Sequence, residues 1–309
     1  MKALQDLDIF VRTVESGSLS ATARALDITP AAASASLKRL EAELQTPLLV
    51  RSTRSLRLTP AGERFLDYCR IALTALRDGQ EELATGRRAV RGSLQIAAPS
   101  DFGRHVLLPW LDEFRLQYPE VRFRLMLSDR MADVYREPVD IALRYGEPPD
   151  SSLVALPLAT RNRRVLCASP AYIAAYGAPS DPRELAQAQH HDCLCFMFGD
   201  EVHDRWNFMR GEERISVRVR ASQVANDGHV VRHWAIAGQG VTYKSALDVA
   251  GDLAAGRLVA LCPEWETEPT PLYLVSPDRR LLSPAVGLLR EFIAARCAAL
   301  LATLPAAAA

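Results

Sequence analysis

The sequence has no apolar run that approaches the ~20 consecutive residues needed to cross a bilayer. Its first eight residues, MKALQDLD, include two acids where a signal peptide would be apolar. The six cysteines are scattered through 309 residues, which is typical of free thiols in a reducing compartment and not of a disulfide framework. We therefore expect a cytoplasmic protein with no membrane partner.

The sequence also lacks the common catalytic motifs. It has no P-loop, no G-x-S-x-G, no H-E-x-x-H and no G-x-G-x-x-G after the first strand of its α/β region. Residues 190–195 (HHDCLC) lack the second pair of ligands that a tetrahedral zinc site needs, so a strand with a buried Cys193 or Cys195 is the simpler interpretation. We expect no catalytic residue, no metal and no cofactor.

Net charge is absent as well, since 37 basic residues balance 37 acidic ones. This balance excludes a wholly basic coat for nucleic acid. Residues 1–91, however, carry 14 of the basic and 11 of the acidic residues. The modest basic excess of this segment favours a polyanionic partner there.

What is present begins with the pattern of a small helical module. Its first helix shows the i, i+3, i+4, i+7 spacing of one buried face, at Leu7, Phe10, Val11 and Val14. Ser18 and Thr29 are placed to cap two further helices, over residues 19–26 and 30–44. Residues 48–58 have the pattern of a basic hairpin. Two short helices, a tight turn and such a hairpin describe a winged helix-turn-helix, although a plain helical bundle with a solvated hairpin would show a similar helix pattern.

A winged helix-turn-helix binds double-stranded DNA with the N-terminal half of its second helix facing the base edges. Small side chains there allow close approach, hydroxyl groups offer hydrogen bonds, and cations in the helix and the wing reach phosphates or the minor groove. The candidate DNA-binding residues are Ser18, Thr29, Ala31, Ala32, Ser34, Ala35, Ser36, Lys38, Arg39, Arg51, Arg54 and Arg57.

A long helix follows, from Thr59 to about Arg87. Its apolar positions are spaced 3, 4, 3, 4, 3, which is the seam of a coiled coil with one polar position. The seam residues are Leu66, Cys69, Leu73, Leu76, Gln80 and Leu83. A narrow seam on a long helix predicts a partner helix, so we interpret this segment as a dimerisation helix and linker.

From Gly92 onward the pattern alternates between strands and helices. Residues 94–98, 121–127 and 139–143 read as strands, with a helix over residues 101–117 between the first two. Such alternation predicts parallel strand pairing with right-handed crossovers. The remaining length fits a two-lobed α/β module of about 210 residues.

Four N-terminal segments together resemble the LysR-type transcriptional regulators. They are residues 17–26 (GSLSATARAL), 29–34 (TPAAAS), 48–54 (LLVRSTR) and 58–62 (LTPAG). The resemblance continues through 98–104, 140–144 (DIALR), 168–172 (ASPAY) and 237–240 (AGQG), and covers roughly residues 3–300. It implies a dimer of dimers on DNA sites with dyad symmetry, and an effector domain shaped like a periplasmic binding protein. Two departures are Gln45, where the family usually has Gly, and Ala35, where it often has Arg, Lys or Gln.

The resemblance and the α/β geometry point to the same effector site. Ligands of two-lobed modules bind where strand ends and helix N-termini face the crevice between the lobes, and helix N-termini favour an anion. The candidate effector-binding residues are Pro99, Ser100, Asp101, Phe102, Ser128, Asp129, Arg144, Tyr145, Ala168, Ser169, Asn226, Asp227, Gln239 and Thr242. Arg144 could pair with a ligand carboxylate or form a salt bridge to Asp129 or Asp140, and the serines could equally be helix caps.

The sequence therefore predicts an α plus α/β protein: a winged helix-turn-helix over residues 1–60, a dimerisation helix over 61–91 and a two-lobed effector domain over 92–303. Lobe I is expected at about 92–160 and 268–303, and lobe II at about 161–267. The predicted function is that of a DNA-binding transcriptional regulator, forming a dimer or tetramer and controlled by a small, anionic effector. A two-lobed α/β enzyme or a solute-binding protein is the alternative.

Overall fold

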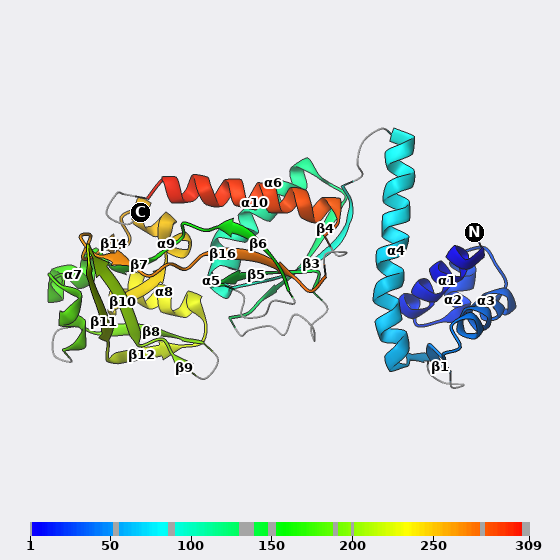
Figure 1. Ribbon diagram of the computed structural model, residues 1–309, viewed down its shortest axis with the longest axis horizontal. Helices are drawn as coiled ribbons and strands as arrows, with labels where there is room; N and C mark the ends of the chain where they lie inside the picture. Colours follow the sequence, from blue (N-terminus) through cyan, green and yellow to red (C-terminus); the bar gives the residue numbers. More distant parts are fainter. Residues whose placement is uncertain are drawn as a thin grey trace. The chain divides into compact units, whose positions relative to one another are not determined.

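The computed structural model describes residues 2–51, 56–85, 90–129, 139–147, 153–187, 191–198, 201–278 and 282–304. The chain forms two compact units, residues 1–89 and 90–309 (Figure 1). None of the helices within the described ranges is long and apolar enough to cross a membrane.

Unit 1 is a small helical module with a two-stranded hairpin. Its elements are α1 (Lys2–Ser16), α2 (Leu19–Ala25), α3 (Pro30–Glu43), β1 (Leu49–Arg51), β2 (Leu56–Leu58) and α4 (Pro60–Thr85). Phe10, Leu37, Leu40 and Leu66 lie in one core to which α1, α3 and α4 all contribute. These elements form the winged helix-turn-helix that the apolar spacing predicts.

Helices α2 and α3 begin at side-chain caps. The Ser18 hydroxyl accepts a hydrogen bond from the Ala21 N–H at 3.3 Å, and the Thr29 hydroxyl accepts one from the Ala32 N–H at 3.1 Å. Each cap satisfies an N–H group that has no partner within its own helix. Pro30 follows Thr29 at the first helical position, where its missing N–H costs nothing.

Both helices end in a left-handed residue that is not glycine. After α3, Gln45 has φ +50°, the Gln45 N–H donates to the Ala42 carbonyl, and the Thr46 N–H donates to the Glu41 carbonyl. These two bonds make a Schellman motif. After α2, Asp27 has φ +54° in the same kind of ending. Gln45 thus adopts the conformation of the glycine it replaces, at a steric cost that glycine would not carry.

The start of α4 is packed closely against the residue that precedes the hairpin. The Thr59 hydroxyl accepts a hydrogen bond from the Gly62 N–H at 2.9 Å and donates one to the Pro47 carbonyl at 2.8 Å. A Cβ atom on Gly62 would lie 2.1 Å from the Leu48 carbonyl oxygen. Glycine is therefore required here because no side chain fits between α4 and Leu48.

The first three residues of the predicted seam in α4 face the core of their own unit. Leu66, Cys69 and Leu73 are buried in the core of unit 1. Leu76, one turn further on, is 44% exposed. The side chains of Gln80 and Leu83 lie outside the described residues. In the first half of α4, the 3–4 spacing therefore arises because the helix packs against its own domain.

Unit 2 contains two main sheets. The first has the order β4–β3–β5–β16–β6, with β3 (Gly92–Ala98) parallel to both β4 and β5. Its other strands are β4 (Val121–Leu127), β5 (Ile141–Tyr145), β6 (Val154–Ala159) and β16 (Leu272–Ser276). The parallel pairing confirms the prediction from the alternating pattern, while β16 joins β5 and β6 in antiparallel fashion.

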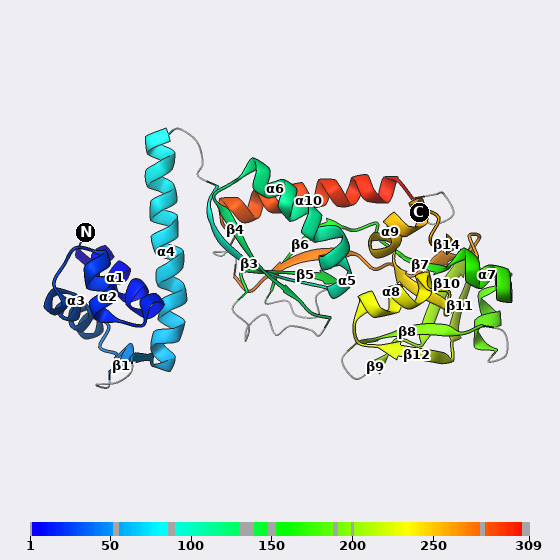
Figure 2. The ribbon, with the colours of Figure 1, turned by 180° about the vertical axis from the view of Figure 1, so that it is seen from behind.

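Helices cover the first sheet. They are α5 (Ser100–Phe102), the π-helical turn η1 (Gly103–Leu107), α6 (Leu108–Gln117) and α10 (Pro284–Ala302). Figures 1 and 2 show α6 and α10 side by side, and Phe114 of α6 contacts Phe292 of α10 edge-on. Phe102, Phe114 and Ile293 are fully buried in this core.

The second main sheet has the order β12–β8–β13–β7–β14, and β9 pairs with β8. Its strands are β7 (Arg164–Ala168), β8 (Cys193–Phe198), β9 (Glu201–Val202), β12 (Ala221–Ala225), β13 (Val241–Ser245) and β14 (Val259–Ala260). A smaller sheet joins β10 (Arg205–Arg210) to β11 (Glu213–Arg218) and β15 (Glu266–Thr267). The helices of this lobe are α7 (Pro170–Tyr176), η2 (Pro182–Ala186), α8 (Gly228–Ile236) and α9 (Ala246–Ala254).

The chain passes between the two lobes at residues 160–163 and 268–271. Asn162, which is fully buried, ties these crossings together. Its amide nitrogen donates to the Thr270 carbonyl at 2.6 Å, and its amide oxygen accepts from the Leu247 N–H at 3.2 Å. One side chain thus joins both crossing segments to the start of α9.

Candidate functional site

The first half of α3 presents an exposed face of small and hydroxyl-bearing residues. Ala31, Ala32 and Ala35 are exposed, as is Thr29 at the cap, and Lys38 is exposed one turn after Ser34. Ser34 is half-buried. An alanine-rich face on a helix start permits close approach to a groove, and the lysine lies where a phosphate could be reached.

Ser36 differs from the expectation that it would face DNA. It is buried, and its hydroxyl donates a hydrogen bond to the Asp6 carboxylate of α1. Arg39 meets the same carboxylate through two bonds, at 2.8 Å from Nε and 2.6 Å from Nη2, while its side chain stays 48% exposed. Ser36 therefore anchors α3 to α1, and Asp6 holds the Arg39 guanidinium in one orientation.

The hairpin is fixed to α3 by a carboxylate. Glu41 accepts hydrogen bonds from the N–H groups of Leu48 and Leu49, at 2.8 and 3.0 Å. Arg57 lies exposed in β2, opposite Val50 of β1. Arg51 lies in β1, but its side chain and the whole of Arg54 are outside the described residues. Ser18 caps α2, so its hydroxyl already has a local partner.

In unit 2, two carboxylates occupy the N-termini of helices from both lobes. Asp129 accepts from the Ser100 N–H at the start of α5 and from the Gly228 N–H at the start of α8, each at 2.7 Å, and also from the Ser100 hydroxyl. Asp227 caps α8, lies 2.9 Å from Ser100 Oγ, where it shares the single hydroxyl proton with Asp129, and accepts from Arg104 Nη1 at 3.1 Å. Burial raises the pKa of Asp227, but these hydrogen bonds outweigh it and lower the pKa overall. Anions therefore already lie at the helix N-termini where the sequence predicts an anionic ligand.

A second cluster of charges is buried just behind the first. Lys244 lies 2.7 Å from Asp101 and 3.1 Å from Asp248, and all three side chains are at most 7% exposed. The Tyr145 hydroxyl donates to Asp248 at 2.6 Å. Burial and the nearby Asp248 raise the pKa of Asp101 to about 7, against the opposing effect of Lys244. The two carboxylates hold Lys244 in its charged form and raise its pKa, although burial opposes this.

Arg232 extends this cluster along α8. Its Nε lies 2.5 Å from Asp252, which is fully buried, and its Nη1 lies 3.7 Å from Asp101. Arg257 binds the other oxygen of Asp252 at 2.6 Å. Each buried carboxylate in this part of unit 2 therefore has a cation within 4 Å, as burial of a charge requires.

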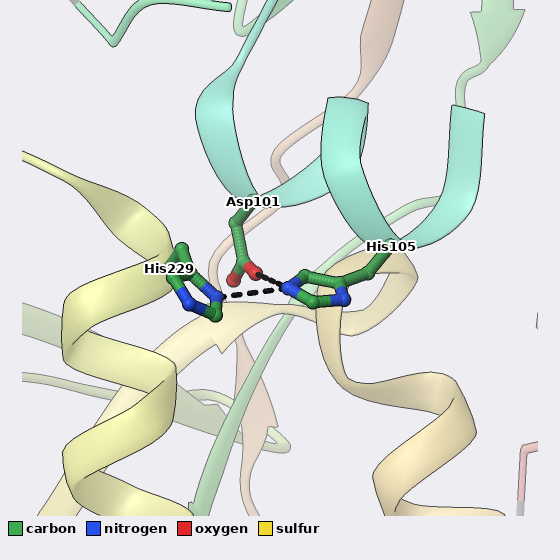
Figure 3. Close-up of side chains that lie close together, drawn as sticks. All are labelled: Asp101, His105 and His229. Carbon is green, nitrogen blue, oxygen red and sulfur yellow. Dashed lines mark hydrogen bonds and ion pairs between the residues drawn. The ribbon is translucent and has the colours of Figure 1, made fainter. Parts of the chain in front are cut away.

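Two histidines meet beside Asp101. His105 Nε2 and His229 Nδ1 are 2.8 Å apart, and the rings are stacked with centroids 4.8 Å apart. Burial lowers the pKa of both rings, and Arg232 and Arg104 add to this. Figure 3 shows the Asp101 carboxylate and the His229 ring both facing the His105 ring.

The structure brings together only part of the predicted effector set. Ser100, Asp101, Asp129, Tyr145 and Asp227 belong to the two charge clusters. Phe102 is a core residue that packs edge-on against Tyr145. Pro99 precedes α5, and Asn226 immediately precedes Asp227. Ser128 follows β4, and its N–H donates to the Ala98 carbonyl. Arg144 lies in β5 opposite Tyr273.

The other predicted residues have structural partners in the second lobe. Ser169 caps α7, after the buried Ala168. Thr242 is buried and donates to the Leu194 carbonyl at 3.2 Å. Gln239 is exposed and accepts from Gln223 at 2.8 Å. Thr242 in particular is a buried sheet residue whose hydroxyl proton is already donated to a backbone carbonyl.

Sequence reasoning missed most of the ionisable residues at this junction. They are Arg104, His105, His229, Arg232, Lys244, Asp248 and Asp252. A signal existed in the four-residue spacing of Asp101 and His105, because ionisable residues four apart share a helical face. Cys193 and Cys195, by contrast, are buried in β8, and burial raises the pKa of each thiol to about 12.

Comparison with known families gives two matches that together span most of the chain. Residues 4–63 match the bacterial regulatory helix-turn-helix protein, lysR family. Residues 87–298 match the LysR substrate binding domain.

Individual relatives are similar over nearly the full length. The HTH-type transcriptional activator TtdR of Escherichia coli K12 is 33% identical over 294 residues, which is 95% of this chain and 93% of TtdR. The HTH-type transcriptional regulator DmlR of the same strain is 32% identical over 290 residues, 94% of this chain and 93% of DmlR. Among solved structures, CrgA, a LysR-type transcriptional regulator from Neisseria meningitidis, gives a TM-score of 0.59 at 29% identity, covering 96% of this chain and 98% of CrgA.

Proposed function

The chain belongs to the LysR family of transcriptional regulators, and from this premise we propose how its two units act. The helix-turn-helix match and the effector-domain match make it a DNA-binding regulator and not an enzyme. We propose three regions: residues 1–60 bind promoter DNA, residues 61–91 dimerise and link, and residues 92–303 bind a small effector. Because its target is the genome, we place its action in the cytoplasm.

The exposed face of α3 is the observation that carries the DNA-binding proposal. Ala31, Ala32 and Ala35 would lie against the base edges, with Ser34 and Thr29 as hydrogen-bonding groups. Lys38, Arg39 and the wing residue Arg57 would bind phosphates. Arg39 is held by Asp6 in a fixed direction, which lowers the entropy lost when it meets a phosphate. Arg51 and Arg54 complete the proposed wing contacts.

A dimer or tetramer would present two or more such helices to DNA sites with dyad symmetry. The exposed Leu76 supports a role for the C-terminal part of α4 in pairing two chains, because the earlier seam residues are buried in the core of unit 1. Two recognition helices one helical turn apart would then read successive major grooves.

An anionic effector fits the junction between the lobes. Asp129 and Asp227 already use the N–H groups of Ser100 and Gly228 and the hydroxyl of Ser100. A ligand carboxylate is the same chemical group, so it could replace Asp129 on these donors. Such an exchange would remove a contact between the lobes and so change their arrangement, a coupling typically worth about 1–3 kcal/mol.

Selection of sheared genomic DNA by the full-length protein at about 0.15 M salt tests the DNA-binding proposal. We expect a few sharply enriched intergenic sites with dyad symmetry. The variant Lys38→Ala should lower retention at every site. Uniform retention of all fragments, or retention unchanged by Lys38→Ala together with Arg57→Ala, would overturn the assigned surface.

A thermal-shift screen of small carboxylates, sugar acids and neutral analogues tests the effector proposal. An anionic compound should raise the melting temperature of the wild type and leave Ser100→Ala unshifted. Ser283→Ala is the control, because Ser283 is another serine at a helix start in unit 2, but its hydroxyl accepts from the Val286 N–H of α10 and bonds to neither Asp129 nor Asp227. If neutral analogues act as strongly as the acids, the effector is not selected by its charge.

A further inference from the structure

Three side chains from both lobes converge beside the proposed effector site. Asp101 lies on α5, His105 on the π-helical turn η1, and His229 on α8. His105 Nε2 is 2.8 Å from His229 Nδ1 and 3.9 Å from Asp101 Oδ1. One potential ligand atom from each of the three residues lies within 4.8 Å of the other two (Figure 3). A π-helical turn of this kind is rare and frequently marks a functional site.

Asp101 carries an unsatisfied oxygen at this point. Its side chain is 2% exposed, and Oδ1 accepts no hydrogen bond from the residues described in the structure. Arg232 Nη1 lies 3.7 Å from Oδ1, beyond hydrogen-bonding distance. The other oxygen, Oδ2, is oriented by Lys244 at 2.7 Å. A buried carboxylate oxygen without a partner is costly, so a bound group on Oδ1 is expected.

We propose that Asp101, His105 and His229 form a binding site for a divalent transition-metal ion of the zinc class. Two imidazole nitrogens and one carboxylate oxygen are a known zinc donor set that leaves a fourth position open. Tetrahedral zinc with bonds of about 2.0–2.2 Å places its ligand atoms roughly 3.3–3.6 Å apart. The distances of 2.8 and 3.9 Å lie on either side of that range, so small side-chain movements complete the geometry.

The surrounding charges permit a divalent cation because each nearby base already has an acid partner. Lys244 is paired with Asp248 at 3.1 Å as well as with Asp101. Arg232 is paired with Asp252, and Arg104 with Asp227. Asp129 adds a further negative charge on the Gly228 side of the site.

The ion would connect the lobes. Asp101 and His105 belong to the first lobe and His229 to the second, so an ion bound by all three favours the arrangement in which α5 and α8 are close. The His105 side chain is 36% exposed, so an ion can reach the site from solvent. Metal occupancy is therefore a second input to the regulatory domain, separate from the anionic effector.

The helix α8 alone offers a competing arrangement. His229 and His233 are four residues apart, with ring centroids 6.3 Å apart, and His233 is exposed. Such a pair on one helical face also binds transition metals. His105 belongs only to the inter-lobe site and His233 only to the helix-face site, so the two variants distinguish the possibilities.

Isothermal titration of Zn²⁺ into the metal-free, untagged full-length protein is the test, with Mg²⁺ as the control ion because it prefers oxygen ligands. We expect one saturable Zn²⁺ site per chain and no heat from Mg²⁺. His105→Ala and His229→Ala should each weaken Zn²⁺ binding at least ~10-fold, and Asp101→Asn should weaken it by a similar factor. His233→Ala should stay within about twofold of the wild type.

Several outcomes would overturn the site. They are the absence of saturable Zn²⁺ binding, a full-affinity His105→Ala, or loss of binding in His233→Ala. Melting of each variant without metal verifies its fold, and His105→Gln replaces His105→Ala if the latter unfolds. The spectrum of bound Co²⁺ gives a second readout: tetrahedral nitrogen and oxygen ligation is expected, whereas a thiolate band would assign the metal to cysteine. No DNA is present in these measurements, so they are independent of the DNA-binding proposal.

Discussion

The two units place their polar residues in opposite ways. In unit 1 the proposed DNA contacts from Thr29 to Lys38 lie on one helix and are mostly exposed. In unit 2 the junction has a buried core, formed by Asp101, Lys244, Asp248 and Asp252, and its residues come from distant parts of the chain. Ser100 bonds to Asp227, 127 residues away, and Tyr145 bonds to Asp248, 103 residues away. An exposed surface needs only one well-placed helix, whereas a buried polar cluster needs the whole domain.

This difference in exposure also determines how much a substitution changes the free energy of unfolding. An exposed cation loses little when its partner is removed, because water replaces the partner. A buried ion left without its partner carries the full cost of its desolvation. Substitutions in unit 1 should therefore alter DNA binding with small changes in stability, and substitutions at the junction should alter stability first.

The largest effect is expected for Lys244→Met. Methionine has a similar length, but its substitution leaves Asp101 and Asp248 buried without their shared cation. The free energy of unfolding of unit 2 should fall by about 3–5 kcal/mol. All four tryptophans lie within residues 90–309, so tryptophan fluorescence in a urea titration reports on this unit alone.

Lys38→Met is the matched control in the exposed region, and it should change the free energy of unfolding of unit 1 by less than about 0.5 kcal/mol, measured by hydrogen exchange of the α1 and α3 amides because unit 1 has no tryptophan. If Lys38→Met cost unit 1 as much as Lys244→Met costs unit 2, the junction charges would be as well solvated as those of α3. The contrast between the units would then fail.

The next largest effect is expected where the backbone of α4 packs closely against Leu48. Gly62→Ala places a Cβ atom against the Leu48 carbonyl and forces α4 away from the hairpin. Unit 1 should lose about 1–3 kcal/mol, as overpacked sites do. Hydrogen exchange of the α1 and α3 amides measures this loss.

Gly287→Ala, in the interior of α10, is the control because nothing lies within 4 Å of its Cβ position. It should stabilise unit 2 by about 0.5–1 kcal/mol, since alanine favours a helix over glycine. Destabilisation by both substitutions would mean that helix propensity and space do not explain the two glycines.

The contrast also explains what could be predicted from the sequence. The caps Ser18 and Thr29, the turn and the hairpin of unit 1 depend on contacts within a few residues, and the sequence pattern predicts them. The parallel strands of the first sheet follow from the alternating pattern in the same way. Family resemblance supplied the identity of the two-lobed domain, which periodicity alone left open.

Long-range partners could not be predicted. Ser36 has the same residue type as a base-contacting serine, and only the position of α1 shows that Asp6 receives its hydroxyl. The 3–4 seam of α4 gives no sign of which helix covers it, and Leu66 and Leu73 prove to face their own domain. His105 and His229 are 124 residues apart, so no spacing rule connects them.

A smaller effect is expected on DNA binding by unit 1. Lys38→Ala should weaken binding to all sequences roughly fivefold at about 0.15 M salt and reduce the salt dependence by about one released ion. Ser34→Ala should change the preference among sequences while leaving that salt dependence intact. Fluorescence anisotropy with an enriched site and a scrambled duplex, at several salt concentrations, separates the two effects. Equal losses on both duplexes for Ser34→Ala would assign Ser34 to the phosphate backbone.

The smallest effect should be a gain in stability at Gln45. A left-handed conformation costs a non-glycine residue about 1–2 kcal/mol. Glycine avoids this cost, but it loses more conformational entropy on folding, so the net gain in stability is smaller. Gln45→Gly should therefore stabilise unit 1 by about 0.5–1 kcal/mol, with no loss of contacts because the Gln45 side chain is exposed. Asp27→Gly, at the equivalent ending of α2, should give less, since aspartate tolerates this conformation better. Hydrogen exchange of the α3 amides orders the two variants. A destabilised Gln45→Gly would show that the glutamine side chain stabilises the C-terminal end of α3. Contacts of an exposed side chain in unit 1 would then outweigh the backbone strain.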